Sequence, residues 1–165
     1  MKNVLSNGLM IAGMLSAPVA VTNAGLPSPA ASPIPAPEQH RTDPRLEVLK
    51  GFFRKGNCPA RDFSEEFLKA ADRHNLDWRL LPSISLVESG CGREARNNNL
   101  FGWDGGRAIF ASVEAGIHDV AYHLAHSKLY RDKSLDEVLR MYNPVGDYPG
   151  VVKSVMKRIS PTEKL

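Results

Sequence analysis

The chain reads LPSISLVESGCGREARNNNLFGW over residues 81–103, and the rest of the domain is organised around this stretch. Its first part is an apolar segment that ends in a single carboxylate, Glu88. A Ser-Gly-Cys-Gly break follows, and then an asparagine-rich loop closed by Phe101 and Trp103. The apolar residues before Glu88 recur at helical spacing. We therefore expect a helix that carries the carboxylate at its C-terminal end, stopped by Gly90 and Gly92.

Two interpretations of Glu88 follow from this position. The negative end of the helix dipole and an apolar neighbourhood both favour the protonated form of a carboxyl group. A carboxyl that keeps its proton near neutral pH can donate it to a glycosidic oxygen, as the acid of lysozyme does. The alternative is a solvated glutamate at a helix end. The residue pattern alone leaves these two interpretations level.

The loop after Glu88 and a later turn contain polar and aromatic side chains suited to a sugar-binding groove. Amide groups can hydrogen-bond sugar hydroxyls, and aromatic rings offer a stacking face. Each residue also has a structural alternative, because asparagines favour turns and aromatics favour cores. The candidate substrate-binding residues are Asn98, Asn99, Phe101, Trp103, Tyr142 and Tyr148.

A mechanism with two carboxylates needs a partner for Glu88. Asp104 in the Asp-Gly-Gly turn is the best-placed weak candidate, although it is equally a typical turn residue. The weaker candidates for this partner are Glu94, Glu114 and Asp119. A partner is dispensable if the substrate is an N-acetyl sugar, whose own acetamido oxygen can act as the nucleophile.

The N-terminal part of the chain is expected to lie outside the fold. Residues 1–24 have an early lysine, an apolar run and small residues at the end, which predicts a secretory signal peptide. An uncleaved anchor is the alternative, but the run is shorter than the ~20 apolar residues that span a bilayer. Residues 25–45 are rich in proline and alanine and predict a disordered linker. The folded domain is therefore placed at residues 46–165, in an exported protein that is periplasmic or extracellular, with no stable membrane span after cleavage.

Charge and histidine spacing narrow the function classes. The net charge is +3, which suits an acidic wall polymer but is too small and scattered to indicate nucleic acid. His118, His123 and His126 lack the i, i+4 spacing that brings two imidazoles onto one zinc ion, so we expect no metal and no cofactor. We expect the protein to be a monomer.

The two cysteines, Cys58 and Cys91, form an even count without metal-binding spacing. In an exported chain this predicts one disulfide, which would tie the N-terminal arm of the domain to the segment after Glu88. Two unpaired thiols are the alternative, because a sequence does not show whether the two Cβ atoms meet.

Helical spacing predicts a mainly α fold of about five helices. A short helix is expected over Arg45–Phe53, and Asp62 with Glu65 predicts a capping box for a helix that runs to Asn75. Further caps are expected at Asp77, at Ser112 and at the pair Ser134 and Glu137, and the last helix runs from Tyr148 to Ile159. Between Arg93 and Ala111 the pattern predicts a small β-hairpin or a tight irregular loop.

Three motifs together resemble the glucosaminidase-type branch of the lysozyme-like superfamily, and more loosely the lytic transglycosylases. They are Val87-Glu88-Ser89-Gly90, Asn98-Asn99-Leu100-Phe101-Gly102, and the turn from Tyr142-Asn143 to Tyr148. The resemblance covers Phe63–Ile159 and implies a lysozyme-like helical domain that cuts peptidoglycan. It places Glu88 as the catalytic acid, residues 98–102 as the cleft loop, and Tyr142 and Tyr148 as cleft tyrosines.

The chain also departs from that family pattern. Some relatives place a second glutamate in the hairpin region, where this chain has only Asp104. Lytic transglycosylases usually have a Gly-Leu-Met-Gln type loop, and here the loop is Leu-Phe-Gly-Trp, which favours the glucosaminidase side. We therefore expect an exported glycosidase that binds peptidoglycan strands. A lytic transglycosylase, a non-catalytic wall-binding module and a helical interaction protein stay open as alternatives.

Overall fold

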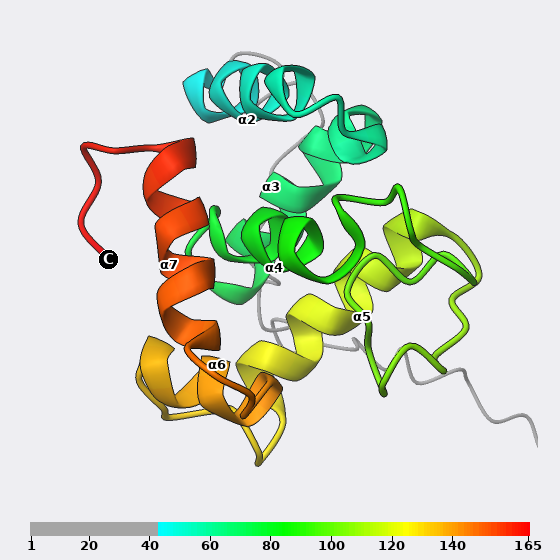
Figure 1. The fold of residues 1–165 in the computed structure, drawn as a ribbon, viewed down its shortest axis with the longest axis vertical. Coiled ribbons are helices and arrows are strands. Elements are labelled where there is room, and N and C mark those ends of the chain that lie inside the picture. The colour runs from blue at the N-terminus through cyan, green and yellow to red at the C-terminus, as the bar shows by residue number, and fades with distance from the viewer. Residues whose placement is uncertain (1–42) are drawn as a thin grey trace, which may run out of the picture. The chain divides into compact units, whose positions relative to one another are not determined.

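The computed structural model describes residues 43–165, which fold into six α-helices and one short 3-10 helix (Figure 1). The expected mainly α fold is confirmed. Among the described residues there is no β-strand, so the segment between residues 93 and 111 is an irregular loop and not a hairpin. The predicted signal peptide and most of the predicted linker lie outside the described residues.

Helix α2 (Pro44–Lys55) begins one residue before the expected helix over Arg45–Phe53 and ends two residues after it. Asp43 caps it, because its side chain accepts a hydrogen bond from the backbone N–H of Arg45 at 2.8 Å. Pro44 takes the first helical position, where its missing N–H costs nothing. Pro44 and Arg45, at the end of the predicted linker, therefore belong to helix α2.

The expected capping box of Asp62 and Glu65 does not form. Pro59–Phe63 is a 3-10 helix (η1), and helix α3 (Ser64–His74) follows it without a side-chain cap. The carboxylate of Asp62 instead lies 3.3 Å from Arg61 at the surface. A tight 3-10 turn before the helix thus replaces the cap that the sequence spacing suggested.

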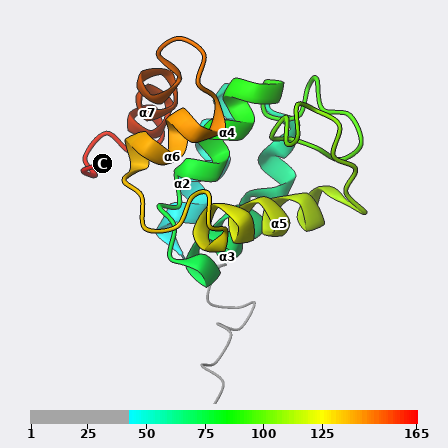
Figure 2. The same cartoon turned by 90° about the horizontal axis from the view of Figure 1, so that it is seen from below.

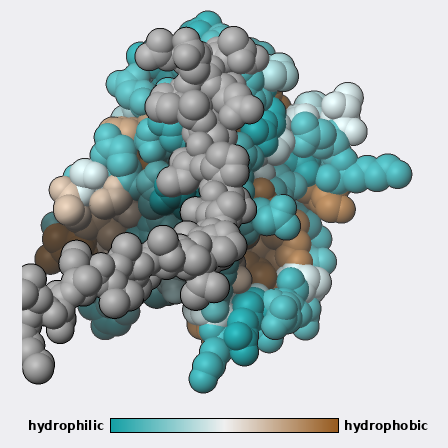
Figure 3. Space-filling model, turned by 180° about the vertical axis from the view of Figure 1, so that it is seen from behind, coloured by the Kyte–Doolittle hydropathy of each residue, from teal (hydrophilic) through white to brown (hydrophobic). Residues whose placement is uncertain are grey.

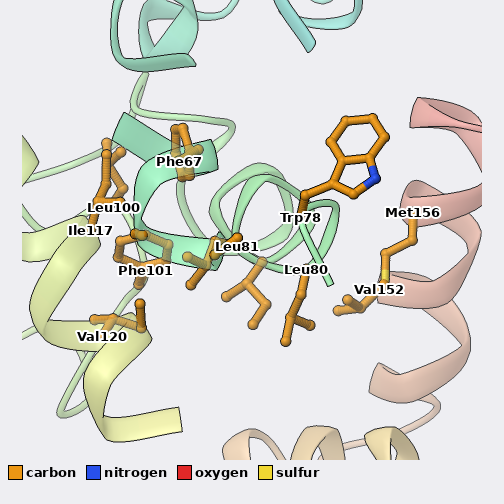
Figure 4. Close-up of a cluster of buried hydrophobic side chains, with 14 of the residues drawn as sticks. Phe67, Trp78, Leu80, Leu81, Leu100, Phe101, Ile117, Val120, Val152 and Met156 are labelled. Atoms are coloured by element: carbon orange, nitrogen blue, oxygen red, sulfur yellow. The ribbon is translucent and has the colours of Figure 1, made fainter. Parts of the chain in front are cut away.

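Helix α4 (Leu80–Ser89) is the central element, with α7 (Tyr148–Ile159) on one side and α3 on the other (Figure 1). Leu81 and Ile84 of α4 are fully buried. Figure 4 shows Leu81 between the cluster of Phe67 and Phe101 and the side chains of α7. The helix that carries Glu88 is therefore held from both sides by apolar packing.

Helices α3 and α5 (Val113–His126) lie side by side and run parallel (Figure 2). Glu66 and His118 meet at 3.0 Å, and eight residues further along each helix His74 and His126 also meet at 3.0 Å. The expected cap at Ser112 is confirmed, because its side chain accepts from the N–H of Ala115. This helix pair forms the wall against which the loop after α4 packs.

Helix α6 (Leu135–Tyr142) begins with the expected capping box of Ser134 and Glu137. It packs against α7, and Lys153 of α7 reaches Asp136 of α6 at 2.6 Å. The short turn between the two helices brings the last residue of α6, Tyr142, close to the first residue of α7, Tyr148. Within the described residues, no helix combines the length and apolar character needed to cross a membrane.

Two long-range connections close the domain. Cys58 and Cys91 form the expected disulfide, with their Cα atoms 5.4 Å apart. The guanidinium of Arg79, only 1% exposed, binds Asp77 and donates to the backbone carbonyls of Ser160, Glu163 and Lys164. The C-terminal segment is thus fixed to the start of α4. The face seen in Figure 3 is hydrophilic over most of its visible surface, with separate apolar patches.

Candidate active site

Glu88 occupies the last turn of α4 and is half-buried. The helix stops there because Gly90 adopts the left-handed conformation, with φ of 59°, and its N–H returns to the carbonyl of Leu86. Glycine takes this conformation without the steric cost that a Cβ would bring. The stop fixes the carboxylate at the point where the chain leaves the helix and enters the loop.

The Glu88 carboxylate lies directly against the backbone of Gly102. A Cβ placed on Gly102 would be 2.8 Å from Oε2 of Glu88, closer than any real Cβ contact. Gly102 also has a φ of 60°, which disfavours other residues. The glycine of the Leu-Phe-Gly-Trp sequence therefore makes room for the carboxylate.

Two polar side chains hold the loop in this position. The hydroxyl of Ser89 lies 2.7 Å from the carbonyl of Leu100, which joins the end of α4 to the loop. The Asn99 side chain accepts hydrogen bonds from the N–H groups of Phe101 and Trp103, and it donates to the carbonyl of Trp103 at 3.0 Å. The Glu-Ser-Gly and Asn-Leu-Phe-Gly sequences thus act as one unit.

Tyr142 and Tyr148 reach the same place from α6 and α7. Their rings stack 5.9 Å apart at an angle of 6°. The hydroxyl of Tyr142 donates to the carbonyl of Phe101 at 2.5 Å. Burial, and after it the nearby charge of Glu88, raises the pKa of Tyr142 above the usual range of tyrosine.

Tyr148 is buried, and its hydroxyl makes no hydrogen bond of ordinary geometry within the described residues. Burial raises its pKa most, followed by the adjacent Glu88 carboxylate. The hydroxyl is therefore close to Glu88 without being tightly bonded to it. A buried hydroxyl beside a carboxylate can help to orient that carboxylate.

A pocket of about 340 Å³ opens beside this group, lined by residues 102–105 with Tyr130 and Tyr142. Trp103 forms one wall, with its ring 5.7 Å from that of Tyr142 and 6.2 Å from that of Tyr130. His123 stacks on Trp103 at 5.6 Å. Two tyrosines and an indole around one opening provide the apolar faces on which a sugar ring can stack.

Tyr130 and His123 were not foreseen as part of the site. Tyr130 lies in the turn after α5, and its sequence neighbours carry no motif. His123 was considered only as a metal ligand. Only the fold brings these two side chains to Trp103, so no local sequence signal identifies them.

Asp104 lines the same pocket, but its carboxylate faces solvent and pairs with Arg107 at 2.7 Å. This guanidinium lowers the pKa of Asp104. Asp104 is thus an exposed turn residue at the rim, with a φ of 54°. Of the other acids considered as partners, Asp119 pairs with His123 at 3.7 Å, and Glu94 is exposed.

The predicted binding residues divide into two groups. Trp103 and Tyr142 line the pocket, and Tyr148 lies behind it beside Glu88. Asn99 and Phe101, only 4% and 0% exposed, build the loop and the core. Their burial does not fit the expected direct contact with a sugar. Asn98 is exposed, and its side chain donates to the carbonyl of Phe110 at 2.9 Å.

The three histidines of α5 are spread along the helix with separate partners. His118 meets Glu66, His123 meets Asp119, and His126 meets His74. In the part of the chain that the structure describes, no three His, Cys, Asp or Glu side chains gather as a metal site would require.

A larger pocket, about 1110 Å³, lies between the start of α6, the outer face of α7 and the C-terminal segment. None of the predicted site residues lines it. We take the smaller pocket as the candidate site because three aromatic rings line it and because Gly102, which also lines it, is in contact with the half-buried Glu88 carboxylate. Comparison with protein-family models, with curated proteins and with solved structures gave no match to this chain.

Proposed function

We propose that this protein is an exported glycosidase that cleaves β-1,4 bonds between amino sugars in bacterial peptidoglycan, within a lysozyme-like domain. The observation that carries the proposal is the position of Glu88, whose carboxylate lies against Gly102 and next to the aromatic pocket. The resemblance of the Glu-Ser-Gly, Asn-Asn-Leu-Phe-Gly and tyrosine motifs to glucosaminidases points to the same chemistry.

Glu88 acts as the general acid in this proposal. A sugar ring stacked on Trp103 and Tyr142 would bring its glycosidic oxygen towards the end of α4. Protonation of that oxygen by the Glu88 carboxyl lets the leaving sugar depart as a neutral alcohol. Tyr148, whose buried hydroxyl lies beside the carboxylate, is suited to hold Glu88 or a bound sugar hydroxyl in place.

The second half of the reaction is assigned to the substrate. Asp104 is bound to Arg107 at an exposed turn, which makes it a poor nucleophile. The acetamido oxygen of an N-acetyl sugar can attack the anomeric carbon in its place and form a cyclic intermediate that water then opens. Asp104 is thereby left to a role at the rim of the pocket.

The test is the ability of the purified protein to clear a gel that contains bacterial cell walls. Glu88→Gln should abolish clearing while circular dichroism shows an unchanged helical fold. Glu94→Gln, which removes an exposed carboxylate from the next turn of the chain, is the matched control and should clear normally. Full clearing of the gel by Glu88→Gln would contradict the proposed function.

A lytic transglycosylase is the second candidate, because Asp104, the best-placed second carboxylate, is paired with Arg107 at an exposed turn. Such an enzyme needs only one acid and uses a hydroxyl of the substrate itself to close an anhydro ring. Mass spectrometry of the released fragments separates the two reactions. Reducing ends indicate hydrolysis, and anhydro-muramic ends indicate transglycosylation.

A non-catalytic wall-binding module would use the same pocket. It would retain wall fragments in a pull-down without releasing product, and Glu88→Gln would leave that retention unchanged. The proposed export is tested separately, by sequencing the N-terminus of the mature protein from the cell envelope. A start at Gly25 would support cleavage of residues 1–24, and the disulfide agrees with an oxidising compartment.

A further inference from the structure

A third pocket, of about 530 Å³, lies between the end of α2, the end of α4 and the end of α7. Phe52 and Leu86 contribute apolar surface, and Lys55, Arg93 and Arg158 contribute three positive charges. No acidic residue lines it. This combination differs from the aromatic pocket beside Glu88 and has no role in the proton transfer proposed above.

The three cations lack acidic partners. Within residues 43–165, none of Lys55, Arg93 and Arg158 has a carboxylate oxygen within ion-pair distance, although 13 pairs of basic and acidic side chains lie within that distance elsewhere. Like charges around one pocket repel each other, and that repulsion opposes folding. An anion bound between them would relieve it.

Two of these cations are held in place by the fold. Arg93 donates to the carbonyl of Gly56 at 2.8 Å, and its guanidinium lies across Gly90, 3.2 Å from where a Cβ would stand. Arg158 lies over the ring of Phe52, with 5.8 Å between the guanidinium carbon and the ring centroid. Guanidinium groups fixed in this way lose less entropy when they bind an anion.

The pocket is adjacent to the turn that carries the candidate acid. Leu86 contributes to it from α4, and Glu88 is two residues further on, which places the two side chains on opposite faces of the helix. An extended peptide of five residues spans roughly 16 Å. That length exceeds the ~10–12 Å diameter of a helix with its side chains. One ligand with a short peptide branch that passes around the C-terminal end of α4 is therefore long enough to join the two faces.

We propose that this pocket, which we call the cationic pocket, binds the peptide stem of the wall polymer through its free carboxylate. Methyl side chains of the stem pack on Phe52 and Leu86, and the carboxylate lies between Arg93 and Arg158, with Lys55 at the rim. A phosphodiester polymer would satisfy the charges but would leave the apolar surface unused. The inference rests on the proposed function, which supplies the polymer to which the stem belongs.

Calorimetric titration with a soluble stem peptide tests the inference. The protein is the full chain with Glu88→Gln, so that no cleavage competes with binding. The peptide with a free C-terminal carboxylate should bind roughly tenfold more tightly than the same peptide with a C-terminal amide, because an ion-assisted hydrogen bond is lost. Equal affinity for the two peptides would overturn the proposal.

Charge removal at the pocket provides the second arm. Lys55→Gln combined with Arg158→Gln should weaken binding of the carboxylate peptide by at least roughly tenfold. Lys128→Gln with Lys133→Gln removes the same charge from exposed positions between α5 and α6 and should leave binding unchanged. An equal loss of affinity in both double variants would show that the effect comes from net charge, and it would overturn the proposed site. Lys55→Gln alone leaves the contact of Arg158 with Phe52 intact. A loss of binding in this single variant therefore does not come from a folding defect caused by losing that contact.

A glycerol-phosphate oligomer forms the third arm, and binding at least as tight as that of the stem peptide would overturn the choice of occupant. Failure of the inference and failure of the proposed function are distinguishable. If the wild-type protein clears cell walls but does not bind the stem peptide, only the proposal for the cationic pocket is contradicted. If the protein binds the peptide but does not clear cell walls, the proposal for the cationic pocket is supported and the proposed glycosidase activity is contradicted.

Discussion

At the scale of single residues, Gly102 decides where the Glu88 carboxylate can lie. The two are in direct contact because glycine has no Cβ, and the left-handed backbone of Gly102 turns the loop across the end of α4. Any larger residue would push the carboxylate away from the pocket.

Gly102→Ala is therefore expected to abolish wall clearing and to lower the free energy of unfolding by about 1–2 kcal/mol, the cost of a left-handed alanine. Gly106→Ala is the control, because Gly106 has a φ of 82°, has nothing within 4 Å of its missing Cβ and does not line the pocket. Urea denaturation should show the same destabilisation in both variants, and only Gly102→Ala should lose activity. Loss of activity in both would show that loop strain, and not the contact with Glu88, is responsible.

Tyr142 and Tyr148 give stability a pH dependence in the alkaline range. The pKa of each is raised in the folded protein, first by burial and then by Glu88, so the folded state keeps these protons more tightly than the unfolded chain. Their contribution to stability is complete below the unfolded pKa of about 10 and is lost as the pH rises above it.

The Tyr142→Phe and Tyr148→Phe double variant should therefore lose less stability than the wild type between neutral pH and about pH 11. The urea midpoint across that range is the measurement. Tyr122→Phe, at an exposed tyrosine of α5, should follow the wild-type curve. Parallel curves for the wild type and the double variant would contradict this account.

At the scale of helices and loops, much of the fold is visible in the sequence. The caps at Ser112 and Ser134 and the stop at Gly90 were predicted because each depends on residues within one turn. The capping box at Asp62 was not found, because Pro59 starts a 3-10 helix that changes the entry into α3. The hairpin was not found either, because Asn99 ties the loop to itself before strands can pair.

The site was only partly predictable for the same reason. Glu88 and Trp103 lie in one stretch of sequence, whereas Tyr130 reaches the pocket only through the packing of α5 against the loop. Asn99 looked like a ligand-binding amide, but it satisfies backbone groups that the loop would otherwise leave unpaired. Local patterns identify polar loop residues without showing which of them the loop itself uses.

The disulfide connects two elements, since Cys58 precedes η1 and Cys91 follows α4. Its cysteines are 33 residues apart, so its loss should lower the free energy of unfolding by about 3–4 kcal/mol. Urea denaturation of the wild type with and without reductant measures this difference. Reductant should have no effect on the variant with Cys58→Ala and Cys91→Ala, and equal stability of the reduced and oxidised wild type would contradict the expectation.

At the scale of the whole molecule, Arg79 connects the first and last parts of the core. It is buried, and it satisfies carbonyls that lie more than 80 residues further along the chain. The residues next to Arg79 in the sequence do not indicate this role. Such a contact exists only after α4 and α7 have packed together, which is why no local pattern predicts it.

Arg79→Met keeps an unbranched apolar stem but removes the guanidinium and its five donors. We expect a loss of about 3–5 kcal/mol in unfolding free energy, because Asp77 and several carbonyls lose their partner. Thermal unfolding followed by circular dichroism is the measurement, and limited proteolysis should cut first near Glu163. Arg131→Met, at an exposed arginine, should change stability by less than about 0.5 kcal/mol.

The two tryptophans of the chain lie in different regions, one at the contact with the C-terminal segment and one at the aromatic pocket. Trp78 is almost fully buried and donates to Glu163 of the C-terminal segment, whereas Trp103 lines the aromatic pocket. In a Trp78→Phe variant the remaining indole fluorescence would come from Trp103 alone, where an entering sugar ring displaces water. The protein therefore contains its own optical reporter of ligand entry, and stopped-flow mixing with glycan fragments could time that entry without an attached dye.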